Sequence, residues 1–204
     1  RAISGGNTLI VDVKDYTDME ILGATRDDAA GECFDKAARV LGLPYPGGKP
    51  MDELAQQSAG GVYDLPRASI EGHPLDMSFS GLKTAVVNLA HNAEQKGQAV
   101  NVADMAASFQ ERIDQILAKK LLAAAADTNA RQVVLAGGVA ANGRLRQLVN
   151  DGAQKLGAKI FLPELKYCGD NGAMIAAQGY YEFKDGNIAD LTLNGLPTLA
   201  IDYR

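Results

Sequence analysis

The spacing of apolar positions changes along the chain, and each spacing predicts one kind of element. Residues 8–13 and 19–25 are rich in β-branched and apolar residues and are separated by a polar turn, which predicts a two-stranded hairpin. Residues 27–41 and 103–126 repeat their apolar positions at helical spacing. The first half of the chain therefore predicts a hairpin followed by long helices.

The middle and last parts of the chain carry shorter elements. Asp52 is expected to open a short helix, and scattered Gly and Pro predict an irregular segment over residues 56–80. The last third predicts, in chain order, a strand at 132–136, a helix at 142–156, a strand at 159–162 and a helix at 170–183. Two strands that are each followed by a helix predict a parallel pair with a right-handed crossover, hence an α/β sheet. An edge strand is expected at 199–201.

Composition places the chain among ordinary globular proteins. It has 204 residues, of which 47% are hydrophobic and 22% charged. No apolar run approaches the roughly 20 residues of a membrane span, so we expect no membrane association and a cytoplasmic location. The net charge of −5 provides no overall positive field for a nucleic acid. An RNA partner would need a local basic patch, a further part of the protein or a second subunit.

Two other features concern the context of the chain. Cys33 and Cys168 lie far apart in sequence and form no CxxC pair, so two reduced, buried thiols are expected. The chain opens at Arg1 without an initiating Met, and its first residues are typical of a strand end that runs into a glycine turn. From this we expect that an upstream part of the protein is missing.

The first chemical motif is a strand that ends in Gly137 and Gly138, followed by Asn142 at a helix start. Two glycines let a ligand approach the backbone, and a helix N-terminus offers free N–H groups. Asn142 would either hydrogen-bond a base or cap the helix. A plain turn with a capping Asn explains the spacing equally well.

The second motif is the glycine turn at residues 4–8. Its functional interpretation is a hairpin that embraces a phosphate with backbone N–H groups and the hydroxyls of Ser4 and Thr8. An ordinary hairpin turn is the alternative. Combined with the first motif, it fits a nucleotide held between a phosphate hairpin and a Gly-Gly turn.

The third motif is an acidic helix face made by Asp28, Glu32 and Asp35. Glu32 and Lys36 form an ordinary i,i+4 pair, which leaves Asp35 the least explained of the three. A carboxylate at this position could accept hydrogen bonds from both ribose hydroxyls. The alternative is that these acidic residues form a solvated helix face.

The fourth motif is Asp170, which precedes a helix and would be either its cap or a metal ligand. The only histidines, His73 and His91, stand in no HxxxH or HExxH pattern, so a complete metal site cannot be assembled from this chain.

The segment 78–85 is not a GxSxG motif. It predicts a buried aromatic, Phe79, that enters a helix capped by Ser80. Lys83 would be either solvated or near a phosphate.

Taken together, these motifs resemble the TsaD family. SGGNT, DDAAGECFDKAARVLGLPYPGGKPMD, MSFSGLKTA, VVLAGGVAANGRLR and CGDNGAMIAAQG occur in order from Ser4 to about Gly179. The resemblance implies that residues 1–204 form the C-terminal α/β lobe of an actin-like ATPase (ASKHA, ribonuclease-H-like) fold. It also implies a helical insertion at about 49–127 and a missing N-terminal lobe. Asn7 replaces the His usual in bacterial members, and CGDN replaces the more usual CTDN.

The resemblance implies an activity in tRNA modification. The threonylcarbamoyl group of threonylcarbamoyl-AMP would pass to N6 of the adenosine 3′ of the anticodon, in tRNAs that read ANN codons. The residues implied to bind this substrate or an ATP- or AMP-type nucleotide are Ala2, Ile3, Ser4, Gly5, Gly6, Asp35, Gly48, Asp52 and Asn142. Asp170 is implied to ligate one divalent metal ion, iron or zinc, whose other ligands are two histidines of an HxxxH motif in the first lobe.

The implied partners are tRNA, a paralogous TsaB-type subunit and a TsaE-type ATPase, and self-association of the lobe is expected as well. Two alternatives stay open at this point. One is another actin-fold kinase or ATPase of a small metabolite, and the other is a non-catalytic nucleotide-binding scaffold subunit.

Overall fold

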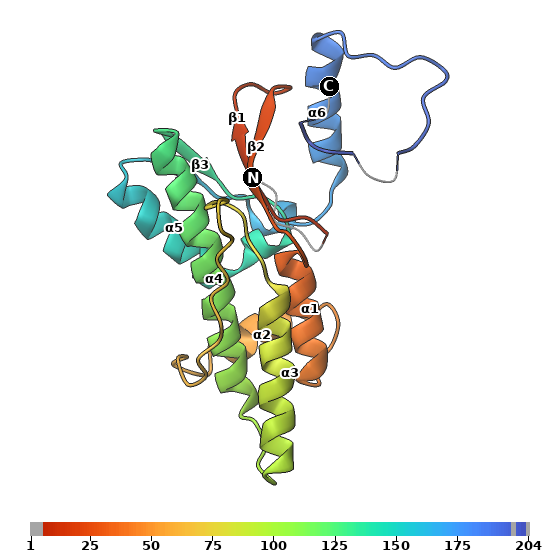
Figure 1. Ribbon diagram of the computed structural model, residues 1–204. Helices are drawn as coiled ribbons and strands as arrows, with labels where there is room; N and C mark the ends of the chain where they lie inside the picture. Colours follow the sequence, from red (N-terminus) through yellow and green to blue (C-terminus); the bar gives the residue numbers. More distant parts are fainter. Residues whose placement is uncertain (1–5, 197–198, 203–204) are drawn as a thin grey trace.

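The computed structural model describes residues 6–196 and 199–202. Figure 1 shows a layer of helices, α1 to α4, with the β1–β2 hairpin above it and α6 set apart beside the hairpin. The sheets are small. β1 (Leu9–Val13) pairs antiparallel with β2 (Met19–Ala24), and β3 (Gln132–Val134) pairs parallel with β4 (Lys159–Phe161). The fold is therefore α/β.

The helical layer contains most of the core. Its members are α1 (Ala30–Val40), α2 (Gly48–Ala55), α3 (Ser80–Gln95) and α4 (Val102–Asp127). Phe34 of α1 meets Phe109 of α4 edge to face, with ring centroids 5.6 Å apart. Met51 and Phe79 are also fully buried. The helices form because each buries an apolar stripe against its neighbours, which offsets the backbone entropy lost on ordering.

Two residues distant in sequence from the helix starts they contact, Thr8 and Asp27, determine by their side chains where α1 and α3 begin. The buried hydroxyl of Thr8 accepts a bond from the backbone N–H of Ala30 at 2.9 Å. The carboxylate of Asp27 accepts bonds from the backbone N–H groups of Phe79 and Ser80. Asp27, not Ser80, therefore caps α3, which corrects the expected cap. Thr8 also cannot offer its hydroxyl to a phosphate, because that hydroxyl is buried at the start of α1.

The last third alternates strand and helix as expected. After β3 come η1 (Gly138–Ala141), α5 (Gly143–Lys155), β4, η2 (Leu165–Tyr167) and α6 (Gly172–Lys184). Arg146 of α5 links the segments before and after this helix. Its guanidinium donates to the carbonyls of Ala140 and Pro163 and to Sγ of Cys168.

α6 packs loosely against the rest of the chain. The ring of Tyr181 stacks on that of Tyr16 at a centroid distance of 3.6 Å, and Gln178 donates to the carbonyl of Tyr16. No residue of α6 is buried, and Ile175 and Phe183 are among its exposed apolar side chains. Figure 1 shows α6 beside the hairpin rather than against the helical layer.

Most element predictions are confirmed, and three are wrong. Asp52 lies in the middle of α2, which already begins at Gly48. The strand expected at 132–136 ends at Val134, and residues 199–201 form no strand. Cys33 and Cys168 are buried free thiols, as expected. None of the helices in the described ranges combines the length and the apolar character needed to cross a membrane.

Candidate functional site

A cavity of about 740 Å³ opens between α1, α2 and the Gly-Gly turn. Four residues that the family resemblance implies for substrate binding lie around it, and they are Asp35, Gly48, Asp52 and Asn142; Gly138 of the Gly-Gly turn joins them. The rest of its wall is mainly apolar and includes Phe34, Tyr45, Pro46, Val139 and Leu165. The structure thus brings together residues that are more than one hundred positions apart in sequence.

Asp35 is fixed by the loop that precedes α2. Its Oδ1 accepts a hydrogen bond from the backbone N–H of Gly47 at 2.7 Å. A Cβ at Gly47 would lie 2.4 Å from that of Ala38, so the loop presses closely on α1 at a position that only glycine fits. A Cβ at Gly48 would meet nothing within 4 Å, which leaves this backbone open to a ligand. Asp35 therefore does not belong to a merely solvated acidic face.

Asp52 stands half-buried on α2 with both carboxylate oxygens engaged. Oδ1 accepts from Nε2 of Gln110 on α4 at 2.9 Å, and Oδ2 accepts from Nε2 of Gln56 at 3.2 Å. Gln110 is buried. The orientation of Asp52 is thus set from within the protein, by the side chain of a neighbouring helix.

The Gly-Gly turn and Asn142 close the opposite side of the cavity. Gly137 has φ 92° and ψ 171°, a backbone conformation that side chains strongly disfavour. Asn142 caps α5, because its Oδ1 accepts from the backbone N–H of Leu145 at 2.9 Å. The capping interpretation is confirmed, and contact of Asn142 with a ligand stays a prediction.

The phosphate side of the predicted site is described only at its edge. Ala2, Ile3, Ser4 and Gly5 lie outside the described residues. Gly6 is exposed, with nothing within 4 Å of a Cβ built there. Binding of a phosphate or carbamoyl group by this hairpin stays a prediction.

The acidic face of α1 is neutralised in part by one lysine. Nζ of Lys36 lies 2.8 Å from Asp28 and 2.7 Å from Glu32. These two hydrogen-bonded carboxylates, Asp28 first, raise the pKa of Lys36 above its ordinary value. The expected pair of Glu32 and Lys36 is confirmed, and Asp28 joins it.

Asp170 does not cap α6. Asn171 is the cap, because its Oδ1 accepts from the backbone N–H of Met174 at 3.0 Å. The exposed carboxylate of Asp170 forms no hydrogen bond with any residue in the described ranges. One free carboxylate fits the oxygen chemistry of a divalent ion. Within those ranges no three His, Cys, Asp or Glu side chains gather around it or anywhere else.

The sequence interpretation missed one buried acid. Asp114 lies on α4 with no exposed surface, and neither of its carboxylate oxygens has a hydrogen-bond partner among the described residues. Burial raises its pKa well above the ordinary value, and the nearby charges of Glu111 and Asp52 raise it further. The available signal was a carboxylate between Ile113 and Ile116, two positions of the predicted apolar face.

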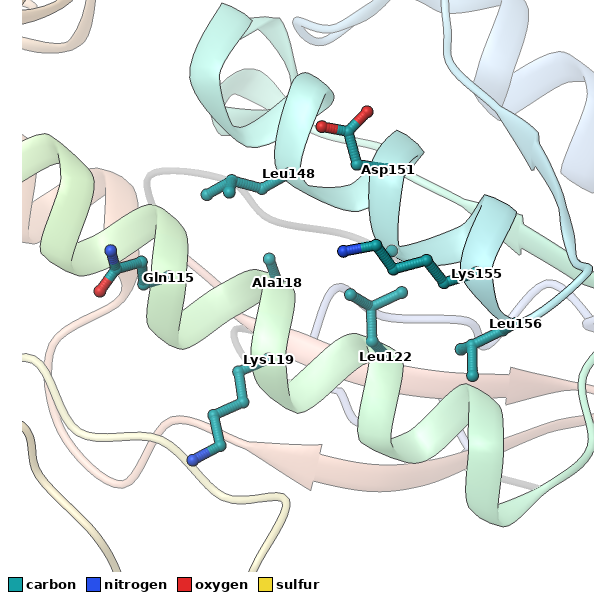
Figure 2. A pocket seen from close by; sticks show the side chains of 9 residues that line it. Gln115, Ala118, Lys119, Leu122, Leu148, Asp151, Lys155 and Leu156 are labelled. Carbon is teal, nitrogen blue, oxygen red and sulfur yellow. The ribbon is translucent and has the colours of Figure 1, made fainter.

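A separate hollow of about 620 Å³ lies between α4 and α5. Figure 2 shows Leu122, Leu148 and Leu156 around it, with Lys119 and Lys155 among its charged side chains. It shares no lining residue with the cavity at α1. Its apolar wall carries no arrangement of groups suited to catalysis, so the cavity at α1 is the candidate site.

The fold and the cavity define an α/β protein with a ligand cavity between two helices and a glycine turn that follows a parallel strand. Residues 1–177 match the sequence profile of the TsaD family, described as tRNA N6-adenosine threonylcarbamoyltransferase, and the chain belongs to this family.

Similar proteins agree with this assignment. Curated relatives named tRNA N6-adenosine threonylcarbamoyltransferase are 48% identical in Moorella thermoacetica and 44% identical in Staphylococcus saprophyticus, each over 98% of this chain. The chain spans 58% of the length of these relatives. The crystal structure of T. kodakarensis HypF matches 76% of this chain and 20% of its own, with a TM-score of 0.55. At 18% identity, that likeness shows a shared fold only.

Proposed function

We propose that the protein containing this chain transfers the threonylcarbamoyl group from threonylcarbamoyl-AMP to N6 of the adenosine 3′ of the anticodon, in tRNAs that read ANN codons. Membership of the TsaD family and the name carried by its relatives support this activity. The observation that carries the proposal is the gathering of Asp35, Gly48, Asp52 and Asn142 around one cavity.

In this proposal the cavity holds the adenylate. The carboxylates of Asp35 and Asp52 accept hydrogen bonds from the ribose hydroxyls or the base, and the open backbone at Gly48 lets the nucleoside lie close to α2. Asn142 contacts the adenylate from the start of α5. The glycine hairpin, residues 2–6 with Ala2, Ile3, Ser4, Gly5 and Gly6, approaches the phosphate and carbamoyl groups.

The reaction proposed is an acyl transfer. The exocyclic amine of the tRNA adenosine attacks the carbamoyl carbon, a C–N bond forms, and the amine loses a proton. The C–O bond to the phosphate breaks, and AMP leaves with the electron pair. The residues of this chain orient the adenylate so that its carbamoyl carbon faces the amine, which converts binding energy into alignment.

Asp170 is the residue of this chain proposed to hold a divalent ion, iron or zinc. A bound metal ion would supply Lewis-acid polarisation of the carbamoyl carbonyl. The proposal is supported by the free, exposed carboxylate, because Asn171 performs the capping that would otherwise occupy Asp170.

Further parts of the proposal concern architecture and partners. We assign residues 1–204 to an actin-like C-terminal lobe with a helical insertion at about 49–127. The substrate is tRNA, and a TsaB-type subunit, a TsaE-type ATPase and a second copy of the lobe are the proposed protein partners, in the cytoplasm. The net charge of −5 favours a composite RNA surface, to which another part of the protein or a partner contributes basic residues.

The test is incorporation of labelled threonine into unmodified tRNA, with ATP, bicarbonate, the adenylate-forming enzyme and the accessory subunits. Full-length protein is compared with Asp35→Asn and Asp52→Asn. We expect incorporation by the wild type and a loss of at least about tenfold in each variant, since each removes a charged hydrogen bond to the substrate. ATP binding without incorporation would favour a metabolite kinase or a scaffold subunit instead.

A further inference from the structure

Two buried side chains of α4, Gln110 and Asp114, carry oxygen atoms that lack a hydrogen-bond partner among the described residues. Gln110 and Asp114 are four residues apart, so successive turns of the helix place them on one side. Gln110 is 5% exposed and Asp114 is 0% exposed. Oε1 of Gln110 and both carboxylate oxygens of Asp114 have no hydrogen-bond partner within the described part of the chain. Leaving such buried groups unpaired would destabilise the fold.

The orientation of the Gln110 amide is determined by Asp52. Nε2 donates to Oδ1 of Asp52 at 2.9 Å, and the reverse orientation would place two acceptors against each other. Oε1 of Gln110 is therefore an acceptor that requires a donor. Arg144 is already engaged, because its guanidinium donates twice to Glu111 and once to Gln147.

Asp114 has the chemistry to supply the missing donor. A carboxylic acid donates one hydrogen bond when protonated and none when ionised. Burial is the main cause that raises the pKa of Asp114, and the negative charges of Glu111 on α4 and Asp52 on α2 act in the same direction. Arg144 on α5 opposes them with a smaller effect. Burial and these charges therefore favour the protonated form of Asp114, whose O–H group can donate a hydrogen bond.

We propose that the protonated carboxyl of Asp114 donates a hydrogen bond to Oε1 of Gln110 and thereby holds the Gln110 amide against Asp52. Asp114 and Gln110 are then positioning residues for the carboxylate that lines the nucleoside cavity. This inference rests on the proposed role of Asp52 in nucleoside binding and extends it to two residues that do not line that cavity.

The arrangement explains why Asp52 keeps one orientation. Its other hydrogen bond comes from Gln56, the exposed residue that follows α2, at 3.2 Å. The bond from buried Gln110 crosses from α4 to α2 and is shorter, at 2.9 Å, so it is the stronger constraint. A donor from Asp114 fixes that amide without placing a second negative charge beside Asp52.

The experiment compares two substitutions at Asp114 in the full-length protein. Asp114→Asn keeps a donor of nearly the same shape, whereas Asp114→Leu fills similar space and donates nothing. AMP binding by calorimetry should stay within about twofold of the wild type for Asp114→Asn and weaken about tenfold for Asp114→Leu, as for loss of one buried hydrogen bond. Ser108→Ala is the control, because Ser108 is buried on the same helix and bonds instead to the backbone of Tyr63.

Two further readouts separate positioning from general damage. The affinity lost by Asp114→Leu should be absent for 2′,3′-dideoxy-AMP, which lacks the hydroxyls that Asp52 is proposed to bind. In protein that already carries Asp52→Asn, Asp114→Leu should cause no additional loss of AMP affinity, since both substitutions act on the same hydrogen-bonded contact to the ligand. The side-chain amide resonance of Gln110 should shift in Asp114→Leu and stay near its wild-type position in Asp114→Asn.

The outcomes distinguish this inference from the proposed function. Equal AMP affinities of Asp114→Asn and Asp114→Leu, or additive losses with Asp52→Asn, would overturn the positioning role even if threonine incorporation is intact. A carboxyl resonance showing Asp114 ionised at neutral pH would do the same. Normal AMP binding with the expected Asp114 pattern but no threonine incorporation would overturn the transferase proposal alone.

Discussion

The carboxylate of Asp27 accepts a hydrogen bond from the backbone N–H of Phe79 at 2.8 Å, although the two residues are far apart in sequence. It also accepts bonds from the hydroxyls of Ser78 and Ser80 and from the N–H of Ser80. Burial opposes the charged form of Asp27, but these bonds outweigh it and lower its pKa. Asp27, three residues before the start of α1, thus determines where α3 begins.

Replacing Asp27 with Ala should destabilise the fold by about 1–2 kcal/mol, the usual cost of losing a helix cap. Asp28→Ala is the matched control, because Asp28 pairs with Lys36 near the surface and should cost less than about 1 kcal/mol. Urea unfolding monitored by circular dichroism measures both. Equal losses in the two variants would contradict the capping role of Asp27.

The hydroxyl of Thr8 should contribute to stability as a buried cap of α1. Thr8→Val keeps the shape and removes the acceptor, so we expect a loss of about 1–2 kcal/mol. Thr8→Ser keeps the hydroxyl and should lose less. If Thr8→Val unfolds at the same urea concentration as the wild type, the bond to Ala30 does not stabilise the fold.

Stability should fall in acid in part through Asp76. Burial opposes its charge, but hydrogen bonds from the N–H of Ala24 and from Arg26 outweigh burial and lower its pKa. Because the folded pKa lies below the unfolded value of about 4, this stabilisation is present above pH 4 and is lost as pH falls through the folded pKa. Asp76→Asn should reduce this acid dependence and cost about 1–3 kcal/mol at neutral pH. Melting temperatures across a pH series would show whether the slope changes.

Alanine substitutions at the neighbouring glycines Gly47 and Gly48 should have different effects, the first on folding stability and the second on AMP binding. A methyl group at Gly47 would collide with Ala38, so Gly47→Ala should destabilise by about 1–3 kcal/mol. A methyl group at Gly48 meets open space beside the cavity, so Gly48→Ala should unfold like the wild type but bind AMP more weakly. Unchanged AMP affinity in Gly48→Ala would remove the nucleoside from this side of α2.

Cys33 should resist alkylation while the protein is folded. Burial is the main cause that raises its pKa to about 12, and its thiol donates to the carbonyl of Phe79. The reactive thiolate is therefore scarce at neutral pH. Mass spectrometry after iodoacetamide treatment should find Cys33 unmodified without denaturant and modified in urea. Rapid labelling of the folded protein would contradict the buried position.

The sequence predicted the helices better than the small sheets. α1 and α4 follow strong helical spacing, and both lie within a few residues of their expected bounds. The strand predicted at 132–136 was too long, and the strand predicted at 199–201 does not form. Both predictions failed because strand formation depends on pairing partners that local spacing does not reveal.

For the candidate site too, some residues were predicted from the sequence and others were missed. Asp35, Gly48, Asp52 and Asn142 were implied by the family resemblance, and the structure brings them around one cavity. The cap of α3 by Asp27 was missed because the bond spans two segments distant in sequence. Asp114 was missed because spacing alone does not distinguish a buried aspartate from the other charged residues of α4.

The bond between Thr8 and Ala30 has a consequence for ligand affinity. It fastens the chain just beyond the glycine hairpin to the first turn of α1, the helix that carries Asp35. Thr8 and the first turn of the helix that carries Asp35 are therefore held together by folding rather than by the ligand. The entropy of fixing this end of α1 is lost during folding, so a nucleotide that contacts Asp35 binds without that cost.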